Sequence, residues 1–450
     1  MTARVTLGET KALPYDLFRL IETRAAVRAS CLGSRSAIEQ ATARIRVSRR
    51  QVLLGLGAGL VVSSLPAPTT ARSRAIRQGL VAVGDGRADA TAALERALGG
   101  DATVVFVPDG TYRITRQILV PSGVVLKGTG NAKILIDVDA FSATDPADTY
   151  AANACALMFR ANRGGGVCGI QFALSAYGAE LIAMAIALRG CSKVHVKHCQ
   201  FEGFSKSKIL RVDSCDDCWI HGNEFHDCHL ESKADAQLTC IDVDDNRLNG
   251  GSTGLRITNN VMRRITVSDA FLSAYGDQTD GINISHASSS GHLIARNLID
   301  TVGEGVDCFG HGCIVRDNWL RSCRNYGVKL VHGARNNVVE NNRIVRPGLG
   351  GIVLAGSSGD AQDTEGNLIA RNVISAVGAS GQWPKSTTFG IKLEDDHGAR
   401  VARNNRITDN VISDGGRMDV GILAADGARD NIIAGNVVKS FARAAYLIAR

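Results

Sequence analysis

One short pattern recurs six times in the second half of the chain and constrains the fold more than any other feature: a glycine followed by apolar, variable and apolar residues. It begins at Gly281, Gly305, Gly327, Gly351, Gly390 and Gly421. Gaps of 24, 22, 24, 39 and 31 residues indicate a repeat of about 22–24 residues, with insertions in two of the repeats. The alternating apolar positions predict short β-strands, since helical repeats need a period of about 3.6 residues.

A second recurrent signal is an asparagine followed by apolar residues, at Asn260, Asn297, Asn318, Asn342, Asn372, Asn410 and Asn436. Asparagine suits a turn position with left-handed backbone geometry, and stacked asparagines can hydrogen-bond to one another. Three strands of about 4–5 residues with their turns fill one repeat of this length. The sequence therefore predicts an all-β solenoid, a parallel β-helix of stacked three-strand coils, in which the asparagines have no catalytic role.

Three segments near the start of the β-helix carry a family resemblance. Residues 83–98 are VGDGRADATAALERAL, residues 104–112 are VVFVPDGTY and residues 122–130 are SGVVLKGTG. They resemble the N-terminal part of the pectate-lyase-like, polygalacturonase-related superfamily, which implies a right-handed parallel β-helix. Ala90, Leu94, Ala97 and Leu98 form an apolar stripe, which predicts a short helix capping the end of the stack. We expect one β-helix domain over residues 76–450, with residues 76–135 as its cap and first coils.

The residues before this domain resemble an export signal. Ser48–Leu54 (SRRQVLL) matches a twin-arginine motif, the uncharged run Val52–Leu65 follows it, and Thr69–Ala71 offers a small-residue cleavage site. That run is too short to span a bilayer as a helix. We therefore expect residues 1–71 to be a twin-arginine signal region with a long n-region, read by the twin-arginine translocase. The mature protein is expected to be periplasmic or secreted, with no stable membrane span.

The net charge of +7 belongs to the same N-terminal region. Residues 1–75 hold 12 Lys and Arg against 4 Asp and Glu, which leaves 39 basic against 40 acidic residues in the remainder. A nearly neutral body exerts no overall attraction on nucleic acid, so we expect no nucleic-acid partner.

Cysteine is frequent, with 12 in the chain. Cys215 and Cys218 have the spacing of a zinc or redox motif, but no second such pair follows them. Further cysteines recur on the repeat rhythm, at Cys191, Cys199, Cys228 and Cys240. We interpret the cysteines as small buried ladder residues, with a disulfide among them as the alternative in an oxidising compartment.

Position +2 after each glycine is expected to face outward, because the apolar positions +1 and +3 face inward. Along the chain this position holds Arg211, Asp242, Asn283, Asp307, Lys329, Val353, Lys392 and Leu423. The register assumes that the 41-residue step from Cys240 to Gly281 contains no additional coil. The mixed acidic and basic part of this ladder ends at Lys329.

Two further rows accompany the ladder. Asp280 and Glu304 directly precede their glycines, and histidines follow three consecutive strands. Acidic, basic and imidazole groups thus converge on residues 280–332, which favours a site over the alternative of a solvated face with salt-bridged ladders. The catalytic candidates are Asp280, Glu304, Asp307, Lys329, His311 and His332. The substrate-binding candidates are Arg211, Asp242, Asp244, Asn283, His286, Lys392 and Trp383.

These residue types fit two kinds of reaction. A glycoside hydrolase needs two carboxyl groups, about 5 Å apart or about 6.5–9.5 Å apart, and Asp280, Glu304 and Asp307 lie on adjacent coils. A lyase acting on a uronic acid needs a base, such as Lys329 or a histidine, and a cation to neutralise the sugar carboxylate. We expect no cofactor; the alternative is Ca²⁺ held by acidic ladder residues, although they form no recognisable calcium loop. The three are Asp242, Asp244 and Asp307.

Part of the site resembles polygalacturonases. Residues 278–282 (QTDGI) are similar to that family's Asn-Thr-Asp-Gly-Ile, which implies that Asp280 is a catalytic carboxylate. Residues 306–308 keep only the second aspartate of the family's Asp-Asp-Cys, as Asp307. Residues 310–312 resemble its Gly-His-Gly but follow Asp307 within the same coil, and Lys329 lacks the arginine of the family's Arg-Ile-Lys.

The sequence thus predicts an exported polysaccharide-active enzyme: a glycoside hydrolase, lyase or epimerase acting on a glycan that contains uronic acid. The alternative is a non-catalytic repeat protein that binds glycan or acts as an envelope scaffold. We expect the insertions at residues 247–279 and 355–388 to form walls beside the site, with Trp383 stacking on a sugar ring or, as the alternative, packing locally within its loop.

Overall fold

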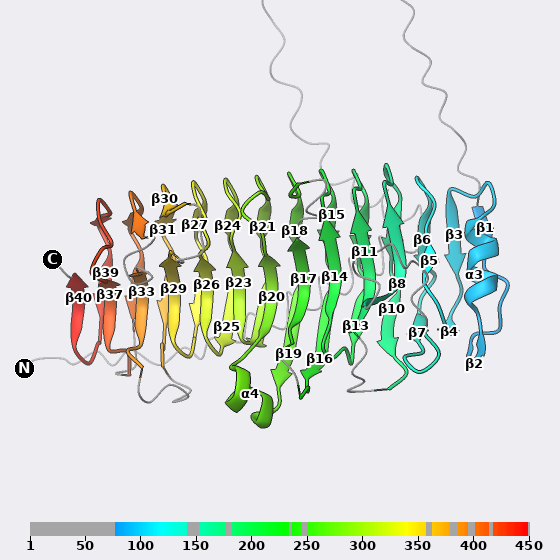
Figure 1. Ribbon diagram of the computed structural model, residues 1–450, viewed down its shortest axis with the longest axis horizontal. Helices are drawn as coiled ribbons and strands as arrows, with labels where there is room; N and C mark the ends of the chain where they lie inside the picture. The colour runs from blue at the N-terminus through cyan, green and yellow to red at the C-terminus, as the bar shows by residue number, and fades with distance from the viewer. Residues whose placement is uncertain are drawn as a thin grey trace, which may run out of the picture. The chain divides into compact units, whose positions relative to one another are not determined.

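The computed structural model describes residues 77–141, 153–176, 182–233, 236–244, 250–356, 362–378, 386–394, 401–413 and 417–448. Within these ranges the chain is nearly all β, and three long parallel sheets make up a right-handed β-helix (Figure 1). The predicted fold class is confirmed. The signal region predicted over residues 1–71 lies outside the described residues.

The first sheet contains β1 (Arg77–Gly79), β3 (Val104–Val107), β6 (Val125–Gly128), β9 (Gly166–Cys168), β12 (His195–Lys197), β15 (Trp219–His221), β18 (Arg256–Thr258), β21 (Leu293–Ala295), β24 (Ile314–Arg316), β27 (Val338–Glu340), β31 (Leu368–Ala370), β35 (Arg406–Thr408) and β38 (Ile432–Ala434). The second contains β2 (Asp85–Asp89), β4 (Gly110–Ile114), β7 (Ala132–Ile136), β10 (Gln171–Leu174), β13 (Gln200–Glu202), β16 (Glu224–Leu230), β19 (Val261–Val267), β22 (Leu298–Val302), β25 (Trp319–Cys323), β28 (Arg343–Val345), β32 (Val373–Ser375), β36 (Val411–Ser413) and β39 (Val437–Lys439). The third contains β5 (Ile118–Leu119), β8 (Asn153–Arg160), β11 (Ile182–Arg189), β14 (Lys208–Asp213), β17 (Leu238–Asp244), β20 (Thr279–Ile284), β23 (Glu304–Cys308), β26 (Tyr326–Leu330), β29 (Gly350–Ala355), β33 (Phe389–Glu394), β37 (Val420–Ala424) and β40 (Ala444–Ile448). A short pair, β30 (Thr364–Glu365) and β34 (Ala402–Arg403), and two helices, α3 (Thr91–Leu98) and α4 (Asp269–Tyr275), complete the elements of the described residues.

Each coil visits the three sheets in turn, so that β21, β22 and β23 form one coil and β24 starts the next. Equivalent residues pair across neighbouring coils, as Asp307 does with Lys329. The long stretch between Cys240 and Gly281 contains no additional coil, because Asp242 pairs directly with Asn283. The register predicted from the glycines is therefore confirmed.

The N-terminal end of the stack is closed by α3, which lies beside the first strands (Figure 1). Its apolar stripe is buried: Leu94 and Leu98 are 0% and 1% exposed. Farther along, stacked rings fill the core, with centroids of Phe172 and Phe201 5.3 Å apart and those of Phe201 and Phe225 4.5 Å apart. In the described part of the chain, no helix is long and apolar enough to cross a membrane.

The recurrent glycine of the third sheet is required because there is no room for a side chain at this position. A Cβ on Gly305 would lie 2.5 Å from the carbonyl oxygen of Gly327, and one on Gly351 would lie 2.5 Å from that of Gly390. The glycine therefore lets successive coils stack closely at the corner where the second sheet leads into the third. This contact explains the sequence repeat.

Replacing Gly305 with alanine is expected to reduce the free energy of unfolding by about 1–3 kcal/mol, because the backbone of the next coil must move to make room. Gly79→Ala is a matched control, since a Cβ at Gly79 would meet nothing within 4 Å. Chemical denaturation of both variants checks the prediction. Equal losses in the two variants would show that crowding at Gly305 is not the cause.

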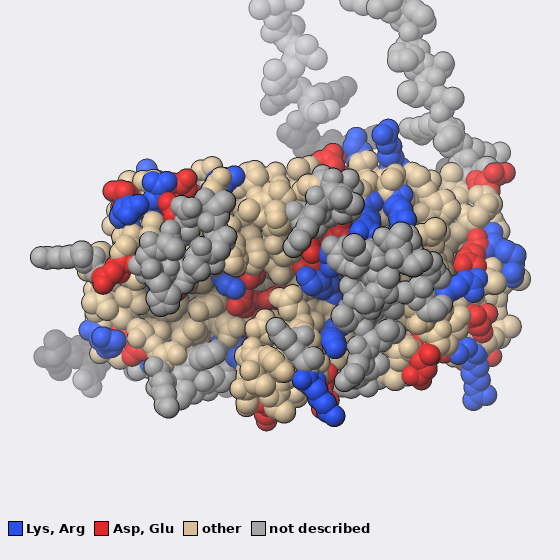
Figure 2. Space-filling model, in the orientation of Figure 1, with Lys and Arg blue, Asp and Glu red and all other residues tan. Residues whose placement is uncertain are grey.

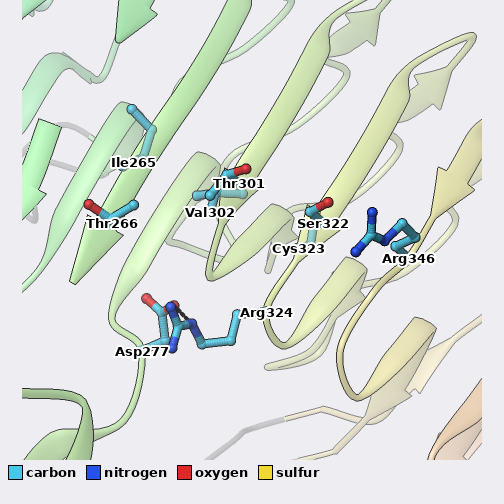
Figure 3. Close-up of a pocket in the computed structure, with 9 residues that line it drawn as sticks. All are labelled: Ile265, Thr266, Asp277, Thr301, Val302, Ser322, Cys323, Arg324 and Arg346. Carbon is cyan, nitrogen blue, oxygen red and sulfur yellow. Dashed lines mark ion pairs between the residues drawn. The ribbon is translucent and has the colours of Figure 1, made fainter. Parts of the chain in front are cut away.

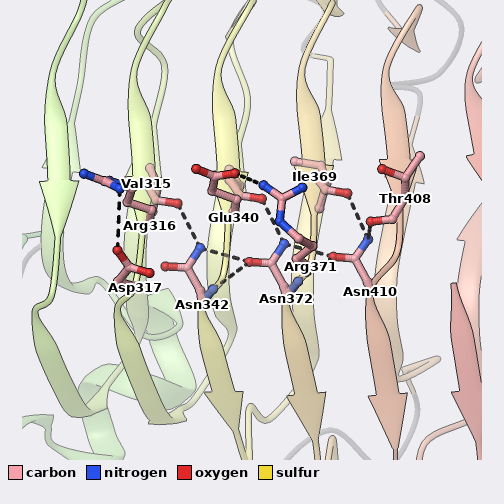
Figure 4. Close-up of polar contacts among 11 residues, drawn as sticks. Val315, Arg316, Asp317, Glu340, Asn342, Ile369, Arg371, Asn372, Thr408 and Asn410 are labelled. Carbon is pink, nitrogen blue, oxygen red and sulfur yellow. Dashed lines mark hydrogen bonds and ion pairs between the residues drawn. The ribbon is translucent and has the colours of Figure 1, made fainter. Parts of the chain in front are cut away.

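The predicted asparagine ladder is present and buried along the corner between the first and second sheets (Figure 4). The side-chain amide of Asn342 donates to Asn372 Oδ1 at 3.0 Å and to the carbonyl of Val315 at 2.9 Å, and Asn372 repeats this pattern with Asn410. The asparagine side chains thus provide hydrogen-bond partners for backbone groups at a corner, where no strand pairing is available.

The left-handed conformation predicted for these asparagines was wrong by one residue. Positive φ angles of 54° and 58° belong to Asn341 and Asp409, each of which directly precedes a ladder asparagine. A second ladder, five residues upstream of the first, was also missed. It comprises Asn337, Asn367, Asn405 and Asn431, joined by the same amide-to-amide hydrogen bonds. Short strands of the first sheet therefore lie between two asparagine ladders.

The cysteines of the described residues occupy the buried positions expected of small ladder residues. Of the 11 described, only Cys168 is partly exposed. Sulfur atoms contact backbone groups of neighbouring coils, as where the amide of Cys191 lies 3.3 Å from Cys215 Sγ. Cys191, Cys215 and Cys218 carry free thiols in the structure.

Candidate functional site

The site is built on the outer face of the third sheet, where two rows of side chains run across the coils. The row at position +2 is confirmed by strand pairing and consists of Arg211, Asp242, Asn283, Asp307, Lys329, Val353, Lys392 and Leu423. The second row consists of the residues that directly precede the glycines. In it Asp280 pairs with Glu304, and Tyr326 occupies the same position on the next coil. Acidic and basic atoms lie side by side in the middle of this face (Figure 2).

Lys329 joins the two rows. Its Nζ donates to Asp307 Oδ2 at 3.0 Å and to Glu304 Oε2 at 3.1 Å. Asp280, on the preceding coil, accepts a hydrogen bond from the hydroxyl of Thr239 at 3.0 Å. Four of the six predicted catalytic residues therefore form one group, which we call the carboxylate cluster: Asp280, Glu304, Asp307 and Lys329.

The cluster is recessed rather than solvated. Asp280, Glu304 and Asp307 are 5%, 8% and 5% exposed, whereas the Lys329 side chain is 25% exposed. The alternative of an ordinary solvated face does not fit these values. Three carboxyl groups beside a single ammonium group also cannot all remain ionised at low cost, because burial penalises each charge.

Burial and this excess of carboxyl groups change the acidity of the cluster. Burial, followed by the charge of Glu304, raises the pKa of Asp280 to about 7. Burial and the adjacent Asp307 raise the pKa of Glu304, and burial raises the pKa of Asp307 although Lys329 opposes the shift. The cluster therefore holds at least one proton near neutral pH and titrates as a unit.

Lys329 is expected to be a cation and not a base. Burial lowers its pKa, but the charges of Asp307 and Glu304 outweigh burial and bring the pKa above its ordinary value. The sequence suggested Lys329 as a possible base in a lyase reaction, and its raised pKa disfavours that role. Its ammonium group can instead neutralise negative charge, either on the carboxylates or on a bound ligand.

The pH dependence of stability should show the raised pKa of Asp280. Because the folded protein holds this proton more tightly than the unfolded chain, the stabilisation is complete below pH 3.8 and is lost as the pH rises through about 7. Buried histidines titrate in the same range, so the comparison must be with a variant. Asp280→Asn should gain stability relative to the wild type between pH 4 and 8, by at most about 1.4 kcal/mol per pH unit. Thermal unfolding of both proteins across this pH range checks the prediction. A stability difference between variant and wild type that does not change with pH would contradict it.

The ladder continues toward the N-terminus as a charged network. Arg211 donates to Asp213 Oδ1 at 2.9 Å and pairs with Asp244, while Lys208 Nζ lies 3.0 Å from Asp242 Oδ2. Burial raises the pKa of Asp213 to about 6 although Arg211 opposes the shift. Because Asp242 and Asp244 already have cationic partners, they are poorly placed to hold Ca²⁺. In the described ranges, no group of three or more His, Cys, Asp or Glu residues is arranged to hold a metal ion.

Two buried acceptor atoms of the ladder have neither a hydrogen-bond donor nor a cationic partner among the described residues. They are Asn283 Oδ1 and Asp307 Oδ1, on adjacent paired coils, and their residues are 3% and 5% exposed. An unpaired buried acceptor costs about 1–3 kcal/mol, so a ligand hydroxyl that reaches these atoms would recover that energy.

The predicted histidines lie beyond the carboxylate cluster, in the turns that follow the strands. His286 Nδ1 is 2.9 Å from Ser288 Oγ, His311 Nδ1 is 2.9 Å from the carbonyl of Ala287, and the His332 ring packs 4.3 Å from that of Phe309. Lys392 lies two coils beyond Lys329 and pairs with Glu394. Trp383 lies outside the described residues.

Tyr326 is a site residue that the sequence interpretation missed. It directly precedes Gly327, the same position that Asp280 and Glu304 occupy before their glycines. Burial and the charge of Glu304 raise its pKa to about 12, so its phenol remains protonated. Its ring stacks with that of Phe389 at a centroid distance of 6.1 Å, which provides an aromatic surface beside the cluster.

Comparison with known proteins places the chain in a family. The sequence model of the family described as rhamnogalacturonase A/epimerase, pectate lyase-like, matches residues 79–307, just over half of the chain. The chain belongs to this family. The model described as periplasmic copper-binding protein (NosD) matches residues 280–447. The pectate-lyase-like superfamily suggested by the N-terminal segments is thereby confirmed.

Individual relatives are more distant. The preneck appendage protein of Bacillus phage PZA and its counterpart in phage phi29 are each 25% identical over 263 residues, which is 58% of this chain. The match spans only 25% of the length of these two relatives.

Solved structures of low sequence identity share the fold. The surface adhesin PfbA of Streptococcus pneumoniae is 15% identical with a TM-score of 0.61, over 81% of this chain and 97% of that one. The tailspike of E. coli bacteriophage HK620, solved in complex with a pentasaccharide, is 14% identical with a TM-score of 0.52, over 80% and 65%. At these identities the likeness shows the fold alone.

Proposed function

We propose that this chain is an exported polysaccharide-active enzyme that performs acid–base chemistry on a glycan bound along the third sheet. The carboxylate cluster carries the proposal. It combines a protonated carboxyl group, a second carboxyl group within reach and an ammonium group, all recessed from water. Such a shared and shifted titration is typical of catalytic carboxyl pairs.

The cluster suits glycosidic bond hydrolysis. Glu304, with its raised pKa, would donate the proton to the leaving oxygen, and Asp280 or Asp307 would act as the second carboxylate. Glu304 and Asp280 are paired on neighbouring coils whose strands lie about 4.8 Å apart, which is compatible with the separation of about 5 Å in a retaining pair.

Lyase or epimerase chemistry on a uronic acid is the other reaction that these groups can support. Lys329 would then neutralise the sugar carboxylate, and an ionised cluster carboxylate would remove the ring proton. The family's description includes both a rhamnogalacturonase and an epimerase, which supports keeping both reactions. The tailspike bound to a pentasaccharide shows that this fold can carry an oligosaccharide.

A non-catalytic glycan-binding protein is the second candidate. Lys329 forms hydrogen bonds with both Glu304 and Asp307, so the cluster is partly neutralised within the protein and would be stable without substrate. The shared fold with a surface adhesin is consistent with such a role.

Export is part of the proposal. Residues 1–71 would direct the chain to the twin-arginine translocase, and residues 76–450 would act as one β-helix domain in the periplasm or outside the cell. The match to a family described as periplasmic supports this location.

The test is incubation with a panel of acidic and neutral polysaccharides. New ultraviolet absorbance from an unsaturated uronate identifies a lyase, new reducing ends without it identify a hydrolase, and a changed sugar composition without cleavage identifies an epimerase. Binding to a panel member with none of these changes would establish the glycan-binding alternative. No reaction and no binding across a broad panel would contradict both candidates.

A further inference from the structure

A pocket lies at the corner between the second and third sheets (Figure 3). Its volume is about 140 Å³, enough for several water molecules and therefore for a carboxylate or sulfate group. Residues Val302 and Asp277 line it, and Glu304 and Asp280 follow them by two and three residues. The pocket and the cluster are thus within about 10 Å of each other along the chain.

The polar lining of this corner pocket consists of cations and hydroxyl groups with one acid, namely Arg324, Arg346, Thr266, Thr301, Ser322 and Asp277. The acid is already neutralised: Asp277 Oδ2 lies 2.8 Å from Arg324 Nε, and its Oδ1 accepts from the Thr279 hydroxyl at 2.7 Å and from the Thr279 amide at 3.1 Å. Two guanidinium groups against one carboxylate leave the pocket with a net positive charge.

Arg346 has no acidic partner among the described residues and supplies the excess positive charge. Its guanidinium group points toward Ser322 across the pocket, while Arg324 and Asp277 lie together on the other side (Figure 3). The residue is exposed, so its side chain can move onto a bound group without breaking a buried interaction. Guanidinium and hydroxyl donors facing one small cavity match the acceptor oxygens of a carboxylate or sulfate.

The corner pocket is rigidly tied to the cluster. The Thr279 hydroxyl that donates to Asp277 also accepts a hydrogen bond from the amide of Gly303 at 2.7 Å, and Gly303 separates Val302 from Glu304. A Cβ on Gly303 would lie 2.6 Å from Asp277 Oδ1, so the two coils are in close contact here. A group bound in the pocket would therefore have a fixed position relative to the carboxylates.

We propose that the corner pocket is an anion subsite, which takes the carboxylate of an acidic sugar while a neighbouring sugar faces the carboxylate cluster. The role in glycan recognition rests on the proposed function, whereas the anion site itself does not. The subsite would select polymers with an acidic group on the sugar next to the reacting one. A sulfate ester presents the same oxygens and is the other source of this chemistry.

The experiment is calorimetric titration of the full chain with sodium galacturonate, sodium sulfate and, as the neutral counterpart, galactose. We expect both anions to bind and galactose not to, with Arg346→Gln weakening anion binding about tenfold to hundredfold, as expected for one charge-assisted contact. Tighter binding of galacturonate than sulfate supports the carboxylate, and the reverse order overturns that assignment in favour of a sulfate ester. Arg343→Gln is the matched control, because Arg343 is exposed on the same coil but packs over the Trp319 ring outside the pocket.

The outcomes for the subsite and for the proposed function are distinguishable. Absence of anion binding to the wild type, or equal binding by Arg346→Gln, overturns the subsite whatever the polysaccharide panel gives. Anion binding that depends on Arg346 supports the subsite even where no polymer is processed, a result that contradicts only the proposed function. Galacturonate binding that is lost in Lys329→Gln but kept in Arg346→Gln would place the anion on the cluster and overturn the subsite.

Discussion

Replacing Asp307 with asparagine is expected to reduce the turnover of the responsive polysaccharide by about 10²–10⁴-fold, the range for loss of a group in acid–base catalysis. Asparagine keeps the shape of the side chain but cannot share a proton with Glu304. Asp307 also supplies one of the two carboxylates that hold Lys329, so the charge of the whole cluster changes. The measurement is the initial rate of product formation with wild type and variant at equal concentration.

Asp300→Asn is the matched control for this prediction. Asp300 belongs to the same coil, but it lies on the second sheet and pairs with Arg321, outside both the cluster and the corner pocket. The control variant should retain wild-type turnover, and both variants should retain the β-sheet circular dichroism of the wild type. Retained turnover in a folded Asp307→Asn would show that the reaction occurs elsewhere on the chain.

Replacing Asn342 with alanine is expected to lower the free energy of unfolding by about 3–5 kcal/mol, the largest effect on stability that we predict. The Asn342 side chain takes part in hydrogen bonds with Asn318, Asn372 and the carbonyl of Val315, and the residue is 1% exposed. Alanine leaves these partners buried and without the amide. Equilibrium denaturation measures the loss.

Asn436→Ala is the corresponding control, because Asn436 is the last member of the same ladder and is half-buried. Water can reach the groups that its side chain leaves, so the loss should be about 1 kcal/mol. Similar losses at Asn342 and Asn436 would mean that burial of the ladder does not determine its contribution.

The fold and the register were predictable because both depend on small residues at fixed spacing. Gly305 and its equivalents are dictated by contact with the next coil, and a contact that recurs in six consecutive coils leaves a period in the sequence. Once the glycines were aligned, the pairing of Asp307 with Lys329 followed. The left-handed turn residue could not be found in this way, since Asn341, Arg371 and Asp409 occupy equivalent positions.

The sequence predicted which residues make up the site better than it predicted their protonation states. Tyr326 directly precedes a repeat glycine, and this position marks a site residue. The sequence interpretation considered only acidic residues at this position and therefore missed the tyrosine. Lys208 and Thr239 carried none, because the coils that contain them lack the glycine that marks the register. The protonation of Lys329 and of the carboxyl groups depends on burial and on distances within the cluster, which spacing in the sequence does not contain.

The most direct measurement of the central claim is a crystal structure of Asp307→Asn with an oligosaccharide from the polymer to which the protein responds. We expect the oligosaccharide to lie along the third sheet over β20, β23 and β26, with a ring oxygen or hydroxyl within about 3.2 Å of Glu304 and hydroxyl groups reaching Asn283 Oδ1. An oligosaccharide bound on the first or second sheet, with the carboxylate cluster untouched, would contradict the claim.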